Sequence, residues 1–393
     1  MKAIVNANVV LPDRVVPGGC VLFEGDTILA SGRIAPPEGA EIIDAGGLYA
    51  GPGFVDEHTH GYHARGRAIG VIQDCDAVAA AHLRHGTTTL TPSAAYNYTR
   101  EEFTAVIRQC NAAVARGDSP IAGVHFEGPY TNPRYGSLSD RAWTYSREAC
   151  EALFDLAGSN ALHCTYAPEL PCAPELEDLL ARRGVIPDIG HTCASPEDIE
   201  RAVDRGARIV THLFDAMGHH LGPAAAAEAT GDVQASAAVA ALATPGLYYE
   251  LICDSMGAHV TRWNAAMTLR AAGEDRVVLI TDCSVGESGA AEAHAPATSA
   301  FAAATDLNFD ENGALSGSYL TMDRACANFM RMTGADVRVA FKCAATNPAR
   351  ALKLDHRLGS LETGKAANIV LTDGDFNVHA VWFRGRPLDG VND

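Results

Sequence analysis

The sequence predicts an α/β fold, a (β/α)8 barrel of the TIM type with a small β-sandwich domain built from both chain ends. At 393 residues the chain is long enough for a barrel of roughly 250 residues and a further domain. In its middle, short β-branched runs alternate with alanine-rich helical stretches, as in a parallel sheet. Both ends consist of short β-like runs separated by Gly, Pro and Asp, which are turn signals.

The two chain ends are similar in character. The first 50 residues contain the runs AIVNANVV, CVLFEGDTILASG and AEIIDAGGLYA, and the last 35 read as strands and turns again. Because the two ends have the same character, we expect them to pair into one small β domain beside the middle of the chain. The expected division is a small β domain of residues 1–50 plus 355–393 and a barrel domain of residues 51–354.

Eight β-like runs follow one another in the middle of the chain. They are GFVDEHTH, GTTTLTPS, IAGVHFEG, ALHCTYAPE, VIPDIGHT, ARIVTHLF, LYYELICD and VVLITDCS. Residues 76–86 and 197–207 between them have helical spacing and finish in glycine, as helices do. Residues 318–332 and 336–345 are expected to be helical, and residues 224–243 to form a loop and a helix. Eight strands of this kind predict a closed barrel.

Composition excludes several classes of protein. The hydrophobic fraction of 47% and charged fraction of 20% are those of a globular protein, and no apolar run has the roughly 18 residues of a membrane span. A net charge of −18 argues against a nucleic-acid partner. Eleven cysteines without any C-x-x-C pair, and an amino terminus without signal-peptide character, lead us to expect a cytoplasmic protein with reduced thiols.

Polar residues that close the apolar runs are the candidate site residues, because barrels of this type form their active sites at the carboxyl ends of the strands. They are His58, His60, Glu127, His191, His212, Asp254 and Asp282. His58 and His60 project to the same face of a strand and form half a metal site, although a hydrogen-bonded pair would have the same spacing. The convergence of the whole set on one rim predicts a divalent metal site.

The sequence resembles the amidohydrolase superfamily and, within it, the N-acetylglucosamine-6-phosphate deacetylases. The matching stretches, which occur in the family's order, are PGFVDEHTHG, HFEGPYTNP, DIGHT, THLFDAM, LITD, LSGSYLTMDRA, NPARALKL and LGSLETGKAANIVL. The resemblance implies that Glu127, His191 and His212 bind the main metal, and that His58 and His60 bind a second one bridged by Glu127. One or two ions are expected, zinc first and iron, manganese or cobalt as alternatives. A homodimer is also implied.

Asp282 matches the family's catalytic aspartate. A divalent metal lowers the pKa of a bound water towards about 7, and a carboxylate beside it can pass the proton to the departing amine. A helix-capping or salt-bridging aspartate is the structural alternative for Asp282. The resemblance therefore implies a hydrolase that removes an acetyl group from the nitrogen of an amino sugar.

Three departures from the family fall on the substrate side. Asp215, followed by Ala216, stands where the family usually has asparagine, and its carboxylate would repel a phosphate. Residues 213–261 contain no Lys or Arg, although the family commonly has a phosphate-binding arginine there. The loop after HFEGPYTNP reads RYGSLSDRAWT instead of the usual G-A-H-type segment. We therefore expect an altered recognition surface and, as a hypothesis, an unphosphorylated or otherwise altered substrate.

Other residues could recognise the substrate instead. Arg134 and Arg141 after the third run, or Arg65 and Arg67 after the first, could supply an anion site, and the alternative for each is a solvated surface arginine. His259 resembles the family's substrate-contacting histidine, at a longer spacing than the usual D-G-x-H. Two alternatives stay open: an N-acyl-D-amino-acid or cyclic-amide hydrolase in which an arginine binds a carboxylate, and a non-catalytic sugar-binding or scaffold protein.

Overall fold

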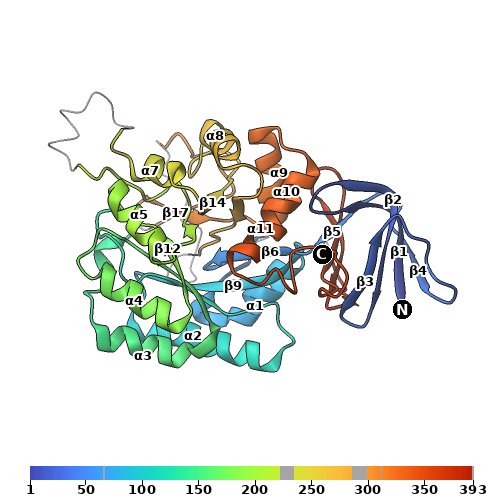
Figure 1. Cartoon of the computed structure of the whole chain (residues 1–393), viewed down its shortest axis with the longest axis horizontal. Helices are drawn as coiled ribbons and strands as arrows, with labels where there is room; N and C mark the ends of the chain where they lie inside the picture. The colour runs from blue at the N-terminus through green and yellow to red at the C-terminus, as the bar shows by residue number, and fades with distance from the viewer. Residues whose placement is uncertain (65–66, 222–233, 286–298, 311, 392–393) are drawn as a thin grey trace.

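The computed structural model describes residues 1–64, 67–221, 234–285, 299–310 and 312–391. Within them the chain forms two eight-stranded sheets and two small hairpins. Figure 1 shows one sheet inside a shell of helices and the other beside that shell, where the two chain ends meet. Of the features expected above, Arg65, the side chain of Arg67 and residues 224–233 lie outside the described part of the structure.

The first sheet is the predicted barrel. Its strands are β6 (Phe54–Thr59), β9 (Thr87–Ala95), β10 (Val124–Glu127), β11 (Ala161–Tyr166), β12 (Ile186–Ile189), β13 (Ile209–Val210), β14 (Tyr248–Ile252) and β15 (Val277–Ile280). Each of the eight expected runs supplies one strand, and neighbours in sequence pair in parallel. Two backbone hydrogen bonds join the ends of β15 and β6, from Asp282 N to His58 O at 2.9 Å and from His60 N to Cys283 O at 2.8 Å. They bring the first and last strand ends together at the mouth of the barrel.

Helices cover the outside of this sheet. They are α1 (Val71–Leu83), α2 (Arg100–Arg116), α3 (Arg147–Ala157), α4 (Ala173–Arg183), α5 (Pro196–Asp204), α7 (Ala237–Ala243), α8 (Arg262–Ala272) and α9 (Met322–Thr333). Thr99 and Ser195 begin α2 and α5 with capping boxes, because each hydroxyl accepts from the third helical amide. Gly117 and Gly184 end α2 and α4 in the left-handed conformation.

The helix expected over residues 318–332 begins later, at Met322. Residues Leu315–Ser318 form strand β17, which pairs with β16 (Leu307–Phe309), and Ser318 Oγ donates to Thr281 O at 2.5 Å. These contacts hold the segment extended. The region expected to be helical at 336–345 is α10 (Val337–Phe341), continued by a π-helical turn, Lys342–Thr346, and α11 (Asn347–Ala351).

The second sheet joins the two chain ends. Its strands are β1 (Lys2–Val10), β2 (Val15–Glu24), β3 (Thr27–Gly32), β4 (Glu41–Asp44), β5 (Tyr49–Pro52), β18 (Ile369–Thr372), β19 (Val378–Phe383) and β20 (Arg386–Pro387). Strand β18 pairs antiparallel with β5, which connects the carboxyl-terminal strands to the amino-terminal ones. A separate hydrophobic cluster that includes Ile4, Phe23, Ile28 and Trp382 packs within this sheet.

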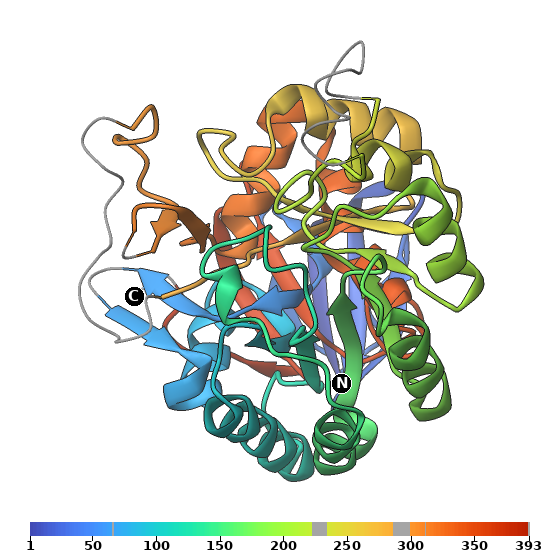
Figure 2. The ribbon, with the colours of Figure 1, turned by 90° about the vertical axis from the view of Figure 1, so that its left-hand side faces the viewer.

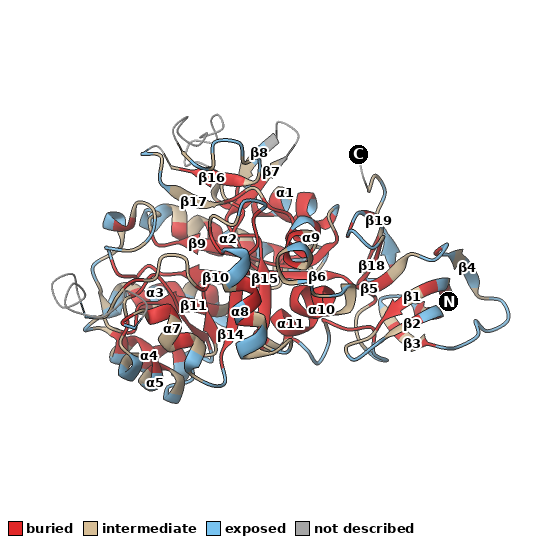
Figure 3. Cartoon of the chain, turned by 90° about the horizontal axis from the view of Figure 1, so that it is seen from above, coloured by how far each residue is buried: buried red, intermediate tan, exposed pale blue. Residues whose placement is uncertain are grey.

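The barrel core has two parts. One apolar cluster lies between the strands and the helices, and a second joins Val55, Ile186, Ile209 and Val278 of the strands to Ala349 and Ala351 of α11. Figure 3 shows buried residues along the barrel strands and on the inner faces of the helices. Among the described residues, no helix combines the length and the apolarity needed to cross a membrane. All eleven cysteines are free thiols.

Two hairpins lie at the barrel mouth. The first joins β7 (Gly61–Ala64) to β8 (Arg67–Gly70), and the second joins β16 to β17. Figure 2 shows both at the same side of the barrel. Residues of both hairpins line the cavity described next.

Candidate metal centre and active site

A cavity of about 410 Å³ opens at the carboxyl ends of the barrel strands. Its polar floor consists of His60, Glu127, His191, His212 and Asp282, which follow or end five different strands. Its walls come from the loop after β9, the loop after β10, the loop after β13 and the β16–β17 hairpin. The fold therefore gathers residues from distant parts of the chain around one space.

Glu127 is the common neighbour of four histidines. Its Oε1 lies 3.0 Å from His191 Nε2, 3.4 Å from His212 Nε2 and 3.3 Å from His58 Nε2. Its Oε2 lies 3.3 Å from His60 Nε2. The groups His58, His60, Glu127 and Glu127, His191, His212 are each compact enough to hold a metal ion, and Glu127 belongs to both. A carboxylate with its two oxygens divided in this way suits a bridging ligand.

The other ring nitrogen of each histidine faces an acceptor from the protein. The Nδ1 contacts are His58 with Glu250 Oε2 at 3.2 Å, His60 with Ser93 O at 3.2 Å, His191 with Tyr135 O at 3.0 Å, and His212 with Asp215 O at 3.2 Å. In a neutral imidazole, such an acceptor places the hydrogen on Nδ1 and leaves the lone pair on Nε2. The four Nε2 lone pairs then all point towards the carboxylates of the floor.

That arrangement fits a metal. His58 Nε2 lies 3.2 Å from His60 Nε2, and His191 Nε2 lies 3.1 Å from His212 Nε2. Two facing lone pairs at these distances repel each other unless positive charge lies between them. Neutral imidazoles and carboxylates are also the ligands that divalent metals of the zinc class prefer. The residues of the floor therefore suit one or two divalent ions.

The pKa shifts of the floor residues also indicate that this group of side chains attracts positive charge. Burial alone would lower the pKa of His60, but the charge of Glu127 and the hydrogen bond to Asp282 raise it to about 9. Burial alone would raise the pKa of Glu127, but the charges of His60 and His58 hold it well below its usual range. Glu127 is therefore a carboxylate at neutral pH, and it attracts cations.

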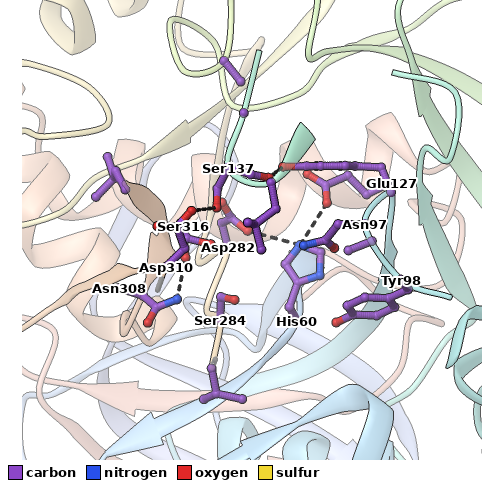
Figure 4. A pocket seen from close by; sticks show the side chains of 18 of the residues that line it. His60, Asn97, Tyr98, Glu127, Ser137, Asp282, Ser284, Asn308, Asp310 and Ser316 are labelled. Atoms are coloured by element: carbon purple, nitrogen blue, oxygen red, sulfur yellow. Dashed lines mark hydrogen bonds and ion pairs between the residues drawn. The ribbon is translucent and has the colours of Figure 1, made fainter. Parts of the chain in front are cut away.

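Asp282 lies on the same floor, directly after β15. Its Oδ1 is 3.3 Å from His60 Nε2 and 3.6 Å from His58 Nε2, and Figure 4 shows His60 between Asp282 and Glu127. The backbone of Asp282 has a φ of 42°, in the left-handed region that non-glycine residues rarely adopt. His191 and His212 share this feature, with φ values of 46° and 30°. Strained backbone of this kind often marks functional positions.

Close packing holds the loop after β10 against the floor. Tyr96 donates from its hydroxyl to Ser137 O at 2.5 Å, and its ring centre lies 4.5 Å from that of His191. A Cβ at Gly136 would lie 2.5 Å from His191 Nδ1, so only glycine allows this approach. Tyr96, Gly136 and Ser137 all line the cavity.

Of the residues expected to contact the substrate, some line the cavity and others lie outside it. Asp215 and Ala216 line the cavity. His259 is buried beside it, does not line it, and lies with Nδ1 3.2 Å from Asp254 Oδ2. Arg134 and Arg141 are exposed and do not line it either, since the loop between them presents Gly136, Ser137 and Leu138 instead. Arg134 lies over the ring of Tyr135, 5.5 Å from its centre.

Sequence reasoning missed several residues of the site. Glu250 is fully buried on β14, and its Oε2 accepts from both His58 Nδ1 and the His212 amide, at 3.2 and 3.1 Å. A charged residue inside the apolar run LYYELICD was a usable signal for it. Asn308 and Asp310, which also line the cavity, lie on the β16–β17 hairpin, where no pattern marks them.

A second set of histidines and a carboxylate lies inside the barrel. His125, His163 and Asp188 are fully buried and close enough together to be considered as a metal site. The rings of His125 and His163 are stacked, 4.0 Å apart and 7° from parallel. None of the three lines the cavity.

Comparison with known proteins agrees with this geometry. Residues 49–388 match the model of the amidohydrolase family. The N-acetylglucosamine-6-phosphate deacetylase of Rattus norvegicus is 30% identical over 405 residues, covering 95% of this chain and 93% of the relative, and that of Lysinibacillus sphaericus is 27% identical over 381 residues, covering 92% of each.

Solved structures give the same result. The N-acetylglucosamine-6-phosphate deacetylase of Pasteurella multocida has a TM-score of 0.82 and 26% identity, covering 98% of this chain and 99% of the other. A mutant of the Mycobacterium smegmatis enzyme, in complex with N-acetyl-D-glucosamine-6-phosphate, has a TM-score of 0.81 and 25% identity, covering 98% of each. The chain belongs to the amidohydrolase family and, within it, to the N-acetylglucosamine-6-phosphate deacetylases.

Proposed function

We propose that this protein is a metal-dependent hydrolase that removes the acetyl group from the nitrogen of an amino sugar. The observation that carries the proposal is the floor of the cavity, where Glu127 is shared by four inward-facing histidine nitrogens and Asp282 lies beside them. The deacetylase relatives, which match nearly the whole chain, supply the reaction and the substrate class.

The metal would be held by the floor residues. Glu127, His191 and His212 would bind the main ion, and His58 and His60 with Glu127 a second. When bound, a divalent metal supplies Lewis acidity, which polarises the acyl oxygen and lowers the pKa of water. Glu250 would fix the orientation of His58 through Nδ1, as carboxylates beside metal-binding histidines do.

Asp282 is the proposed proton carrier. It lines the cavity and lies 3.3 Å from His60 Nε2, so its carboxylate faces the place where the amide must lie. A carboxylate there can accept a proton from the attacking water and deliver it to the departing nitrogen. Its backbone is fixed on both sides, because Asp282 N donates to His58 O and Asp282 O accepts from Ser318 N at 2.8 Å.

The walls suit a small polar molecule. Asn97, Tyr98, Ser284 and Asn308 line the cavity and offer hydroxyl and amide groups to a sugar. No arginine is found among the described lining residues, so the alternative in which an arginine binds the carboxylate of an N-acyl amino acid has no support in this cavity.

Several finer features are proposed with it. Zinc is the proposed metal, a homodimer the proposed assembly, and the cytoplasm the proposed location, supported by eleven free cysteines. The proposed domain division stays at residues 1–50 plus 355–393 and 51–354, supported by the β18–β5 pairing. Elemental analysis, sedimentation and limited proteolysis test these features separately.

The direct test is acetate release from N-acetylated amino sugars by the metal-loaded protein. We expect release that stops after chelation and returns when metal is added back. Asp282→Asn, which keeps the size of the side chain, should lower kcat by at least about 10²-fold while metal content stays the same. Metal-loaded protein that releases no acetate from any N-acetyl amino sugar would overturn the proposal.

A further inference from the structure

The walls of the cavity carry negative charge and, among the described residues, no cationic side chain of Lys or Arg. Besides Glu127 and Asp282 on the floor, Asp215 and Asp310 line it. The sequence has two arginines whose side chains lie outside the described part of the structure, Arg65 and Arg67, since residues 222–233 and 286–298 contain neither Lys nor Arg. The chain as a whole has a net charge of −18. A substrate entering this space therefore meets carboxylates on several sides.

Asp310 is held in place by the hairpin. Its Oδ1 accepts from the amides of Asn312 and Ala314, each at 2.9 Å, and its Oδ2 accepts from Ser137 Oγ at 2.8 Å. Ser137 belongs to the loop after β10, so this hydrogen bond connects that loop to the β16–β17 hairpin. Figure 4 shows Ser137 and Asp310 together at the end of the cavity away from Tyr98. The carboxylate cannot turn away from an approaching anion without breaking these contacts.

Amides of the loop after β13 already have acceptors within the chain. Those of Leu213 and Asp215 donate to Glu250 O and His212 O, each at 2.8 Å. The Ala216 amide donates to Asp215 Oδ1 at 2.9 Å. The chain's own carboxylate therefore satisfies this donor, and an external phosphate would have to displace it.

His259 and Arg134 are the basic side chains to consider as binders of a phosphate. His259 lies with its Nδ1 and its backbone amide against Asp254 Oδ2, at 3.2 and 3.0 Å, and its buried Nε2 has no hydrogen-bond partner among the described residues. His259 does not line the cavity. Arg134 is exposed over Tyr135, outside the cavity. Binding of a dianion needs cationic or amide donors aimed at it. The walls instead provide acceptors for hydrogen-bond donors.

We propose that the enzyme selects N-acetylated amino sugars without a phosphate, and that Asp215 and Asp310 determine this selectivity by accepting hydrogen bonds from hydroxyl or ammonium groups of the substrate. This inference rests on the proposed deacetylase function and names its substrate class. It differs from what the relatives' names would suggest, because they refer to a 6-phosphate sugar.

The test compares three substrates that differ only at carbon 6: N-acetylglucosamine, its 6-phosphate, and its 6-amino-6-deoxy derivative. We expect kcat/KM to rise from the phosphate to the hydroxyl compound by about tenfold or more, and the ammonium compound to equal or exceed the hydroxyl one. The preference should weaken at high ionic strength, because salt screens partly exposed charges.

Asp215→Asn and Asp310→Asn remove the charges but keep an oxygen for the amides of Ala216, Asn312 and Ala314. Each substitution should lower, several-fold, the ratio of kcat/KM for N-acetylglucosamine to kcat/KM for its 6-phosphate. Asp306→Asn is the matched control, since Asp306 lies four residues before Asp310 and does not line the cavity. It should leave the ratio unchanged.

The outcomes separate the two proposals. Deacetylation of the 6-phosphate as the best substrate, with a ratio that neither variant changes, would overturn the inference and leave the deacetylase function in place. The absence of acetate release from all three compounds would count against the deacetylase function itself. A ratio that narrows in both variants but not in Asp306→Asn supports the inference.

Discussion

Two clusters of histidines and a carboxylate lie in this barrel, and they differ in what their nitrogens face. Around Glu127, each histidine has its Nδ1 bonded to the protein and its Nε2 directed at the Glu127 carboxylate. In the interior cluster, both nitrogens of each histidine have partners: Ser93 Oγ and Thr165 Oγ1 for His125, and Asp188 Oδ2 and Thr91 Oγ1 for His163.

The pKa values of the histidines also differ between the two clusters. Burial lowers the pKa of His163 to about 3, and burial with the charge of His163 lowers that of His125 well below its usual range. His60 at the mouth has a pKa raised to about 9. The interior histidines are therefore neutral hydrogen-bonding groups, whereas the histidines and carboxylates at the barrel mouth form a group that attracts a cation. Residue types alone do not make a metal site; free lone pairs and access to solvent do.

The largest expected effect is on activity, and it comes from one histidine at the mouth. His191→Asn removes a ligand of the proposed main ion, and we expect acetate release to fall about 10³-fold or more, with less bound metal. Acetate release and metal content measured on the same sample check this. His163→Asn is the matched substitution in the interior and should retain the metal. Equal metal loss in both variants would remove the distinction between the clusters.

The second largest expected effect is on metal affinity, and it comes from Glu250, which accepts hydrogen bonds from the proposed ligands His58 and His212. Glu250→Gln keeps an acceptor for His58 Nδ1 and the His212 amide but loses the charge. We expect the metal affinity to fall by about 10–100-fold, with activity recovering as metal is added in excess. Metal titration followed by activity checks this. Activity that stays low at saturating metal would show that Glu250 acts in some other way.

The interior cluster should affect stability instead. His163→Asn leaves Asp188 Oδ2 without its partner at 2.5 Å in a fully buried position. Loss of this hydrogen bond, which leaves a buried acceptor unsatisfied, should lower the free energy of unfolding by about 1–3 kcal/mol. Denaturant unfolding of the metal-free protein measures it. An unchanged midpoint would mean that water replaces the histidine and that the interior is more open than described.

The smallest expected effect is on stability, and it concerns a partly exposed group of ion pairs around Glu274. Arg338 and Lys342 contact Glu274 at 2.7 to 2.8 Å and hold its pKa at about 2, below its ordinary 4.5. A lowered carboxyl pKa stabilises the fold above pH 4.5, and this stabilisation is lost as the pH falls towards 2. Since the Glu274 side chain is 35% exposed, we expect less than about 1 kcal/mol from it.

The measurement is the free energy of unfolding of the wild type and of Glu274→Gln at several pH values. The difference between them should be present at pH 7 and shrink between pH 4.5 and pH 2, because the Glu274 carboxyl of the unfolded chain is protonated there while that of the folded chain is still largely ionised. A difference that grows with acidity would contradict the sign of the pKa shift.

The barrel and the floor of its site could be predicted from sequence because both follow from strand periodicity. Apolar runs that end in His60, Glu127, His191 or Asp282 place those residues at one rim once the strands are parallel. The walls could not be predicted in the same way. Arg134 points outward because Gly136 brings the loop against His191, and Asp310 enters the cavity through a hairpin whose pairing has no sequence period.

The measurement that tests the central claim most directly is the number of metal ions per chain in three proteins: the wild type, Glu127→Gln and Asp188→Asn. The two variants make the same chemical change in the two clusters. We predict one or two ions in the wild type and in Asp188→Asn, and a large loss in Glu127→Gln. Full retention of metal in Glu127→Gln, with loss in Asp188→Asn, would contradict the assignment of the metal centre to the barrel mouth.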